Sequence, residues 1–272
     1  MLSDLLNLPA RSSKPRERGL THVLDRGLSL AQVDGLLEVC GEAVDIVKLG
    51  WGTAVVTGNL EAKLARYHAH GVPVVLGGTL TELAIAQGRF EELLDRIREL
   101  GLRHIEISDG TITIPHQQKL ALIERCREEF TVLSEVGSKD DTRIMAPYRW
   151  VELIEAELEA GAWRVIAEAR ESGTTGIFRH DGEVRMGLID EIAHAIPVER
   201  IIFEAPRKDQ QVWFVRRFGV EVNLGNILPE DVLSLETIRL GLRSDTAGGG
   251  EPTPPEESSE DSVLRIPPPR HA

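Results

Sequence analysis

The chain has 272 residues, 42% of them hydrophobic and 28% charged, a balance typical of a globular domain with a substantial core. Its net charge of −13 and the lack of a basic stripe argue against nucleic acid as a partner. No apolar run approaches the roughly 18 residues of a membrane-spanning helix, and the N-terminal segment lacks the features of a signal peptide. The two cysteines, Cys40 and Cys126, fit reduced thiols in helices, so we expect a cytoplasmic protein without a membrane partner.

Composition divides the chain into three segments. Residues 1–18 form a polar arm with prolines and several basic side chains. Residues 19–245 alternate between short apolar runs and longer helix-patterned stretches, and we expect them to form one catalytic domain. Residues 246–272 are rich in Pro, Gly, Ser and Glu. Such a tail cannot bury enough apolar surface to offset its ordering entropy, so we expect it to be disordered.

Eight short apolar runs of the middle segment are each followed by a helix-patterned stretch. In chain order they span residues 21–27, 45–52, 72–78, 103–110, 131–137, 164–170, 200–205 and 220–226. Eight strand–helix units predict an α/β fold, a single (β/α)₈ TIM barrel, whose active sites lie at the C-terminal ends of the strands. A doubly wound open sheet is the weaker alternative, because no Gly-x-Gly-x-x-Gly motif follows the first run.

Residues at helix ends support the helical stretches. Ser29, with Gln32 three positions later, predicts a capping box at the start of the first helix. Pro147 and Gly161 frame the helix after the fifth strand, and Pro229 opens the last one. This placement matches the preference for proline at the start of a helix and glycine after its end.

Alternation along each strand predicts which side chains face the barrel interior. In the fourth run, Ile105 and Ile107 share the face that should meet the helices, which turns Glu106 inward. The same reasoning places Asn223 and Glu221 on one face of the eighth run. Five strands thereby aim ionisable groups at the interior near their C-terminal ends, namely Lys48, Glu106, Glu135, Glu168 with Arg170, and Glu204.

Four carboxylates in one pocket need positive partners, because burying an unpaired charge costs several kcal/mol. Lys48, Lys139, Arg170 and a divalent cation are the candidates. The oxygen-rich donor set favours Mg²⁺ or Mn²⁺ over zinc. The predicted metal ligands are Glu106, Asp109, Glu135, Glu168 and Glu204. Ion pairs that only seal the barrel rim are the alternative.

Several loops after the strands suit an anionic substrate. A glycine–threonine pair opens the helix after the third strand, and amides at a helix start bind anions. The Ser-Gly-Thr-Thr-Gly loop after the sixth strand adds hydroxyls and amides, and barrels often hold phosphate near strands seven and eight. The predicted substrate-binding residues are Gly78, Thr79, Ser172, Gly173, Lys208, Asn223 and Gly225. Simple turns and solvated surface charges are the alternative reading.

Nine motifs follow one another along the chain: GLTHVLDRGL, VDIVKLGWGT, GGTLTE, IEISDGTI, EVGSKD, EAGAWRVIAEARESG, IIFEAPRKDQQVWFVRRFG, VNLGNI and LETIRLGLRSDT. In this series the chain resembles the phosphosulfolactate synthase family over roughly residues 16–246. The resemblance implies a barrel enzyme, a lyase, with Mg²⁺ as cofactor. Its implied reaction adds sulfite to phosphoenolpyruvate and gives (2R)-O-phospho-3-sulfolactate, on the way to coenzyme M or sulfolactate.

The chain departs from the family pattern at two places. Ser138 precedes Lys139 where the family commonly has two lysines, and Glu221 stands where a small polar residue is usual. A carboxylate at the second place could alter anion affinity. The resemblance maps the family's catalytic lysine onto Lys139, which we predict to be the acid that protonates C2 of the substrate. Lys48 and Arg170 are the other predicted catalytic residues, because they would neutralise the substrate charges.

Small anionic substrates are the expected partners, and we expect a homo-oligomer. Two alternative functions stay open at this point. The first is a related barrel enzyme that acts on another phosphorylated carboxylate. The second is a non-catalytic binding or stress protein on the same scaffold.

Overall fold

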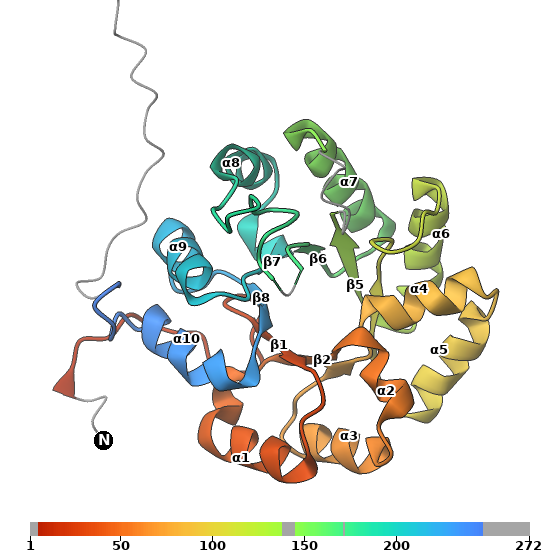
Figure 1. Ribbon diagram of the computed structural model, residues 1–272, viewed down its shortest axis with the longest axis horizontal. Helices are drawn as coiled ribbons and strands as arrows, with labels where there is room; N and C mark the ends of the chain where they lie inside the picture. Colours follow the sequence, from red (N-terminus) through yellow and green to blue (C-terminus); the bar gives the residue numbers. More distant parts are fainter. Residues whose placement is uncertain (1–4, 138–144, 171, 247–272) are drawn as a thin grey trace, which may run out of the picture.

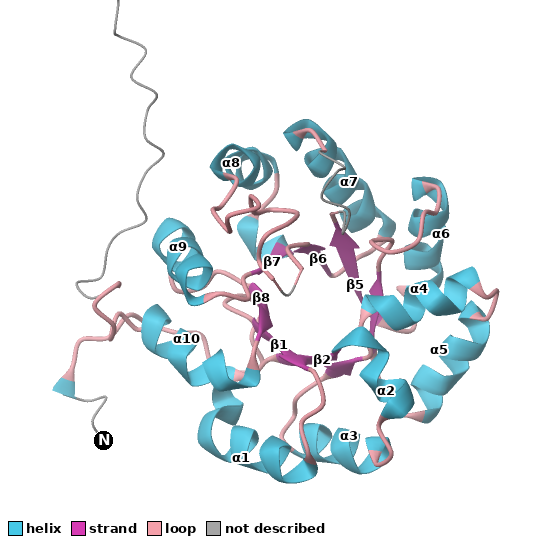
Figure 2. Cartoon of the chain, viewed as in Figure 1, coloured by secondary structure: helices cyan, strands magenta, loops and turns pink. Residues whose placement is uncertain are grey.

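The computed structural model describes residues 5–137, 145–170 and 172–246. Its strands form a ring that is enclosed by helices (Figure 1, Figure 2). The strands are β1 Thr21–Asp25, β2 Ile46–Leu49, β3 Val74–Val75, β4 His104–Ile107, β5 Thr131–Val136, β6 Arg164–Ala167, β7 Ile201–Glu204 and β8 Leu224–Ile227. The α-helices are α1 Leu30–Cys40, α2 Thr53–Val56, α3 Leu60–Ala69, α4 Gly78–Ala86, α5 Phe90–Glu99, α6 His116–Cys126, α7 Pro147–Ala160, α8 Met186–Ala195, α9 Lys208–Phe218 and α10 Val232–Arg239.

The strands pair in parallel in the order β3-β2-β1-β8-β7-β6-β5-β4. Because β1 pairs with β8, the first and last strands meet inside the sheet, as a barrel requires. Within the described residues, β3 and β4 are the ring neighbours that no hydrogen-bonded ladder joins. The predicted (β/α)₈ barrel is therefore confirmed, with all eight strands inside or overlapping the predicted runs. None of the helices in the described ranges is long and apolar enough to cross a membrane.

The predicted helix ends are also present. Ser29 and Gln32 form both hydrogen bonds of a capping box at the start of α1. Pro147 is the first residue of α7, and Gly161 ends that helix with a φ of 115°, which favours glycine. Pro229 opens a short 3₁₀ turn, Pro229–Asp231, directly before α10.

The core has two parts, which separate as strand alternation predicted. One large cluster packs between the strands and the surrounding helices, and it contains Ile105 and Ile107. A second, small cluster fills the barrel interior and consists of Leu20, Ile46, Val75, Leu133, Ile166 and Ile202. Four of these residues precede Lys48, Glu135, Glu168 and Glu204 by two positions, so the charged side chains lie above an apolar plug.

Strand β8 begins later in the chain than predicted, at Leu224 and not at residue 220. Asn223 lies before Leu224, the first residue of the strand, and therefore at the N-terminal end of the barrel. Its Oδ1 accepts the Leu20 N–H at 2.9 Å, and its Nδ2 donates to the Ile201 carbonyl at 3.0 Å. The prediction that Asn223 binds substrate is wrong, because its amide is used to join three chain segments at the far end of the barrel.

The polar arm is anchored to the N-terminal end of the barrel. Arg11 contacts Glu221 at 3.5 Å and Glu236 at 3.0 Å. The Ser12 N–H and hydroxyl donate to Glu221 at 2.8 Å and 2.7 Å. Glu221 thus binds the arm, and the idea that its carboxylate tunes anion affinity is not supported by this position. Residues 1–4 and the predicted tail from 247 onward lie outside the described residues.

Candidate active site

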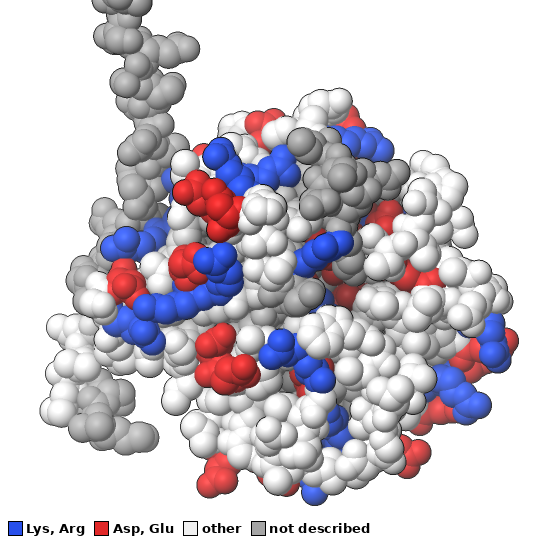
Figure 3. Space-filling view, in the orientation of Figure 1, with Lys and Arg blue, Asp and Glu red and all other residues white. Residues whose placement is uncertain are grey.

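A cavity of about 300 Å³ lies at the C-terminal ends of the strands. On this face, basic and acidic side chains are interspersed around a central hollow (Figure 3). Four carboxylates, a lysine and an arginine face the cavity together with small, aromatic and amide side chains. Its lining consists of Leu24, Lys48, Gly50, Trp51, Gly77, Gly78, Thr79, Glu106, Thr111, Glu135, Glu168, Arg170, Glu204 and Asn226.

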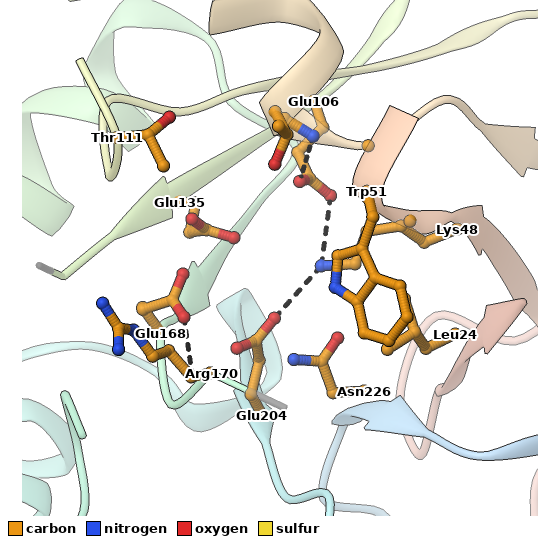
Figure 4. A pocket seen from close by; sticks show the side chains of 14 residues that line it. Leu24, Lys48, Trp51, Glu106, Thr111, Glu135, Glu168, Arg170, Glu204 and Asn226 are labelled. Carbon is orange, nitrogen blue, oxygen red and sulfur yellow. Dashed lines mark hydrogen bonds and ion pairs between the residues drawn. The ribbon is translucent and has the colours of Figure 1, made fainter. Parts of the chain in front are cut away.

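Lys48 is the buried cation of the cavity (Figure 4). Its Nζ donates to Glu204 Oε1 at 3.1 Å and lies 3.7 Å from Glu106 Oε2. All three side chains are buried, and they come from β2, β7 and β4. The ion pairs thus cross the barrel interior and hold three strand ends in register around one point.

The charges change the proton affinity of these groups. Burial opposes the charge on Lys48, but attraction by Glu106, Glu204 and the other carboxylates outweighs it, so the pKa of Lys48 is raised. Burial is the largest effect on Glu106 and raises its pKa to about 7, although Lys48 acts in the opposite direction. Burial also raises the pKa of Glu204. Lys48 therefore stays protonated, while its acidic partners hold protons more readily than exposed carboxyl groups.

Gly78, the first residue of α4, fixes Glu106 from its other side. Its N–H donates to Glu106 Oε1 at 2.6 Å. A Cβ atom at Gly78 would lie 2.1 Å from Ser108 Oγ and 2.8 Å from Glu106 Oε1, so only glycine permits this approach. Thr79 follows in the same turn and also lines the cavity. The helix start therefore binds a carboxylate of the protein itself.

The backbone turns sharply after β6, and this turn orients Glu168, Glu204 and Arg170 in the cavity. Arg170 has a φ of 52°, in the left-handed region. Its N–H donates to Glu168 Oε1 at 2.6 Å, and the Ala169 N–H donates to Glu204 Oε2 at 3.0 Å. These bonds orient both carboxylates, and the exposed Arg170 guanidinium lies at the cavity mouth (Figure 4).

Glu135 and Glu168 face the cavity from neighbouring strand ends (Figure 4). The Glu135 backbone is held from outside the barrel, because Lys119 Nζ lies 2.5 Å from its carbonyl oxygen. Lys139, three positions after Val136 in the sequence, lies outside the described residues. Its role as the proton donor therefore stays a prediction.

Asp109 and Lys208 do not line the cavity, although both were predicted to contribute. Asp109 Oδ1 accepts from Lys119 Nζ at 2.9 Å, so its carboxylate turns toward α6. Lys208 begins α9 and pairs with Asp245 at 2.5 Å. Each is held outside the cavity by its ion-pair partner, which is Lys119 for Asp109 and Asp245 for Lys208.

Ser172 and Gly173 also lie outside the cavity lining. The Ser172 hydroxyl is 2.9 Å from that of Thr174, on the exposed surface. Gly173 has a φ of 64°, and its carbonyl accepts from Gln210 Nε2 at 2.8 Å. The loop after β6 is thus tied to α9 through the Gly173 carbonyl, and Arg170 is its residue in the cavity lining.

Gly225 lies inside the barrel but not in the cavity lining. A Cβ atom there would lie 2.9 Å from Ile202 Cγ2 and 3.3 Å from His22 Nδ1. Gly225 therefore leaves space for the apolar plug and for a fully buried histidine, which the sequence did not mark as important.

Three lining residues with polar or aromatic side chains were not predicted from the sequence: Trp51, Thr111 and Asn226. Trp51 and Asn226 have positive φ values of 56° and 54°, which no strand pattern reveals. Thr111 is brought in by a distant contact, because its N–H donates to Glu82 on α4 at 2.7 Å. The only available signal was the position of Trp51 and Asn226 at the ends of apolar runs.

The carboxylates of the cavity are its candidate metal ligands. The described residues contain no group of three or more His, Cys, Asp or Glu side chains that could by itself hold a metal ion. Mg²⁺ usually retains several waters and takes one or two carboxylates together with substrate oxygens. Glu135 and Glu168 come from the neighbouring ends of β5 and β6, both line the cavity, and they offer such a pair. The donor set fits a partly hydrated Mg²⁺.

Comparison with known proteins gives a consistent result over nearly the whole chain. The model of a family described as (2R)-phospho-3-sulfolactate synthase (ComA) matches residues 9–245. The phosphosulfolactate synthase of Methanothermobacter thermautotrophicus is 44% identical over 246 residues, which cover 88% of this chain and 95% of that protein. The phosphosulfolactate synthase of Bacillus subtilis is 42% identical and covers 89% of this chain and 97% of its own length.

Solved structures resemble the chain in fold. A 3-hexulose-6-phosphate synthase superposes with a TM-score of 0.53 at 14% identity, covering 80% of this chain and 99% of its own. At this identity the likeness concerns the barrel architecture alone, since one barrel fold carries many unrelated activities.

Proposed function

The chain belongs to the (2R)-phospho-3-sulfolactate synthase family, and we propose that its cavity joins sulfite to C3 of phosphoenolpyruvate. Membership makes it a lyase-type enzyme that forms a carbon–sulfur bond. The observation that carries the substrate proposal is the meeting of Lys48 and Arg170 in one small cavity at the C-terminal end of the barrel. Both proposed substrates are anions, and both need positive groups before they can approach each other.

The two cations have different parts in holding the substrates. Lys48 is buried, fixed by Glu106 and Glu204, and remains protonated, so it offers a permanent positive charge deep in the cavity. Arg170 lies at the mouth, where its planar guanidinium can bind a phosphate or carboxylate with two parallel hydrogen bonds. A substrate with an anionic group at each end can therefore bridge the depth and the mouth of the cavity.

The proposed reaction forms one bond and moves one proton. The sulfur lone pair of sulfite attacks C3 of phosphoenolpyruvate, and the electrons of the C2–C3 double bond move onto the substrate carboxylate. The Lys48 ammonium stabilises this added negative charge by electrostatic attraction. A proton then reaches C2 from one face, which sets the configuration, and the phosphate group stays attached throughout. Lys139 is the proposed donor of that proton.

Mg²⁺ is the proposed cofactor, with Glu135 and Glu168 as its protein ligands. When bound, it would supply Lewis-acid stabilisation of the charge that develops on the substrate carboxylate. The Arg170 N–H holds Glu168 Oε1, and Lys119 holds the backbone of Glu135, so both ligands are oriented by the protein itself. Ordering of the ligands beforehand lowers the cost of binding a hydrated ion.

The test is a turnover assay with phosphoenolpyruvate, sulfite and Mg²⁺, followed by phosphorus NMR and mass spectrometry. We expect one product that contains both the phosphate and the sulfonate group and no release of inorganic phosphate. Omitting Mg²⁺ should abolish turnover, and adding it back should restore it. A folded protein that binds phosphoenolpyruvate but forms no sulfonate would contradict the proposal.

Thermal shift separates this function from another phosphorylated carboxylate as substrate. A ligand that binds only the folded state raises the melting temperature by mass action. We expect phosphoenolpyruvate to stabilise the protein more than other phosphorylated carboxylates at equal concentration. Stronger stabilisation by a different compound, without sulfonate formation, would favour the related-enzyme alternative.

A further inference from the structure

The strained backbone of the described residues is concentrated around the active-site cavity. Trp51, Arg170 and Asn226 are the non-glycine residues there with positive φ, at 56°, 52° and 54°. All three line the same cavity, although Trp51 follows β2, Arg170 follows β6 and Asn226 lies inside β8. Left-handed backbone is costly for residues with a Cβ atom and persists where the surrounding structure imposes it, often at functional sites.

Asn226 adds a second, independent observation. Its side chain is buried, with a residue exposure of 5%. Yet Oδ1 has no hydrogen-bond partner in the described part of the protein. A buried amide oxygen without a partner destabilises the folded protein, and such groups are rare in native structures. The Asn226 side chain in β8 therefore has an unused hydrogen-bond acceptor, which a bound ligand or water can fill.

The surroundings of Asn226 indicate the kind of partner. Its carboxamide points into the cavity beside Glu204 and Lys48 (Figure 4). The neighbouring acidic groups only accept hydrogen bonds when ionised, whereas a carboxamide both donates and accepts without adding charge. Among the described lining residues, Asn226 carries the one carboxamide. A neutral donor next to the Lys48 ammonium suits an oxygen of an anionic substrate.

We propose that Asn226 is a substrate-binding residue that determines affinity for an anionic substrate, an inference that rests on the proposed function. Its Nδ2–H donates to a carboxylate, phosphate or sulfite oxygen held beside Lys48. Its Oδ1, which has no partner in the described part of the protein, then accepts from a water or a protonated oxygen that arrives with the substrate. Asparagine is suited to this position because it tolerates left-handed backbone better than most residues.

A purely conformational role for Asn226 makes a different prediction. If Asn226 served only the left-handed backbone within β8, glycine would replace it without loss, since glycine adopts the same backbone freely. Asn226→Gly therefore removes the side chain while keeping that backbone conformation. Asn226→Asp keeps the shape and the acceptor but exchanges the donor for a negative charge beside Glu204. A carboxylate there should repel an anionic substrate.

The experiment measures kcat and separate KM values for phosphoenolpyruvate and sulfite, with melting temperatures, for the wild type and both variants. We expect Asn226→Gly to melt at or above the wild-type temperature. Its kcat/KM for at least one substrate should fall by about 10- to 100-fold, the range for losing a hydrogen bond to a charged group. Asn226→Asp should fall further. The substrate whose KM rises is the one that Asn226 binds.

The control is Asn59→Gly at the N-cap of α3, where the Asn59 side chain makes no capping bond. Its kinetics should equal those of the wild type. Wild-type kinetics in Asn226→Gly would overturn the proposal, and if that variant does not fold, unchanged KM values and kcat in Asn226→Asp would do so. An inactive wild-type protein would instead contradict the proposed function and is thereby distinguished from failure of this inference.

Discussion

The two ends of the barrel are both polar, but they use their charges differently. At the N-terminal end, Arg11 and Ser12 of the arm satisfy Glu221, and the Asn223 amide joins backbone groups. At the C-terminal end, Lys48 is surrounded by more carboxylates than it can neutralise. At the N-terminal end these charges pair with groups of the protein itself, whereas the C-terminal cavity combines buried like charges with strained backbone.

The difference between the two ends shows that charged residues near strand ends can have either a structural or a functional role. A buried charge that finds its partners within the fold contributes to stability and specificity of folding. A group of buried like charges with raised pKa values is costly for stability and is typical of a functional site. Substitutions at the two ends should therefore separate activity from stability, and the following predictions test that separation.

The largest effect should come from Lys48→Met in the cavity. Loss of the ammonium should reduce kcat by about 10³-fold, because the charge developing on the substrate loses its electrostatic partner. The control is Lys63→Met, which breaks an equally buried pair with Asp25, 2.8 Å apart but outside the cavity lining. Each variant should lose roughly 3–5 kcal/mol of stability, since a buried charge is left unpaired. Urea unfolding and initial rates measure both quantities.

If Lys63→Met lowers kcat of the folded enzyme as much as Lys48→Met does, the cavity has no special part in activity. Activity would then depend on any buried ion pair of the barrel and not on the cavity.

The next effect concerns Arg239 at the N-terminal end of the barrel. Burial lowers the pKa of Arg239 to about 9, so it remains charged at neutral pH. It donates to the carbonyls of Val220 at 2.5 Å, Val222 at 2.8 Å and Leu20 at 3.3 Å. Arg239→Met leaves these acceptors without their donor and should cost about 3 kcal/mol in unfolding free energy. Kinetics at a temperature where the variant is folded should be unchanged, and a raised KM for either substrate would contradict this assignment.

His22 lies between the two ends and should make stability depend on pH. Burial, assisted by Lys48, lowers the pKa of His22 well below 6.5. Below pH 6.5 the unfolded chain therefore binds a proton that the folded protein does not, and stability falls as the pH falls. The slope is at most about 1.4 kcal/mol per pH unit. His22→Gln should remove this contribution. Urea unfolding between pH 5 and pH 8 measures the unfolding free energy of both proteins. If the two free energies change with pH in parallel, His22 does not cause the dependence.

The smallest effect should come from Ser12→Ala in the arm. The variant loses the hydroxyl bond to Glu221 but keeps the backbone N–H bond. A half-exposed hydrogen bond of this kind contributes about 1 kcal/mol. The melting temperature should fall by a few degrees with unchanged kcat and KM. A change in KM would mean that the two ends are coupled through the barrel interior.

The eight strand–helix units predicted the barrel, and alternation along the strands predicted most of its charged interior. Lys48 and Glu204 were placed correctly because each follows a buried isoleucine by two positions within a short parallel strand. Asn223 was misplaced because the apolar pattern of residues 220–226 does not mark where pairing begins. The strand starts only at Leu224, which pairs with Phe203 of β7.

The rest of the site depends on contacts that a single sequence does not reveal. Trp51 and Asn226 reach the cavity through left-handed backbone, and the strand pattern contains no signal for that conformation. Thr111 reaches it because Glu82, far away in the chain, binds its loop. Asp109 was assigned to the metal from its position after β4, but Lys119 on α6 draws it outward. Loop geometry of this kind is set by tertiary contacts and not by local pattern.

The central claim is that the charged cavity at the C-terminal end is where the substrates meet. The most direct test is a crystal structure of the enzyme with phosphoenolpyruvate and Mg²⁺. We predict phosphoenolpyruvate inside the cavity, with its anionic oxygens in contact with Lys48, Arg170 and Asn226 and with Mg²⁺ beside Glu135 and Glu168. Well-ordered phosphoenolpyruvate bound anywhere outside this cavity, in crystals of active enzyme, would contradict the account.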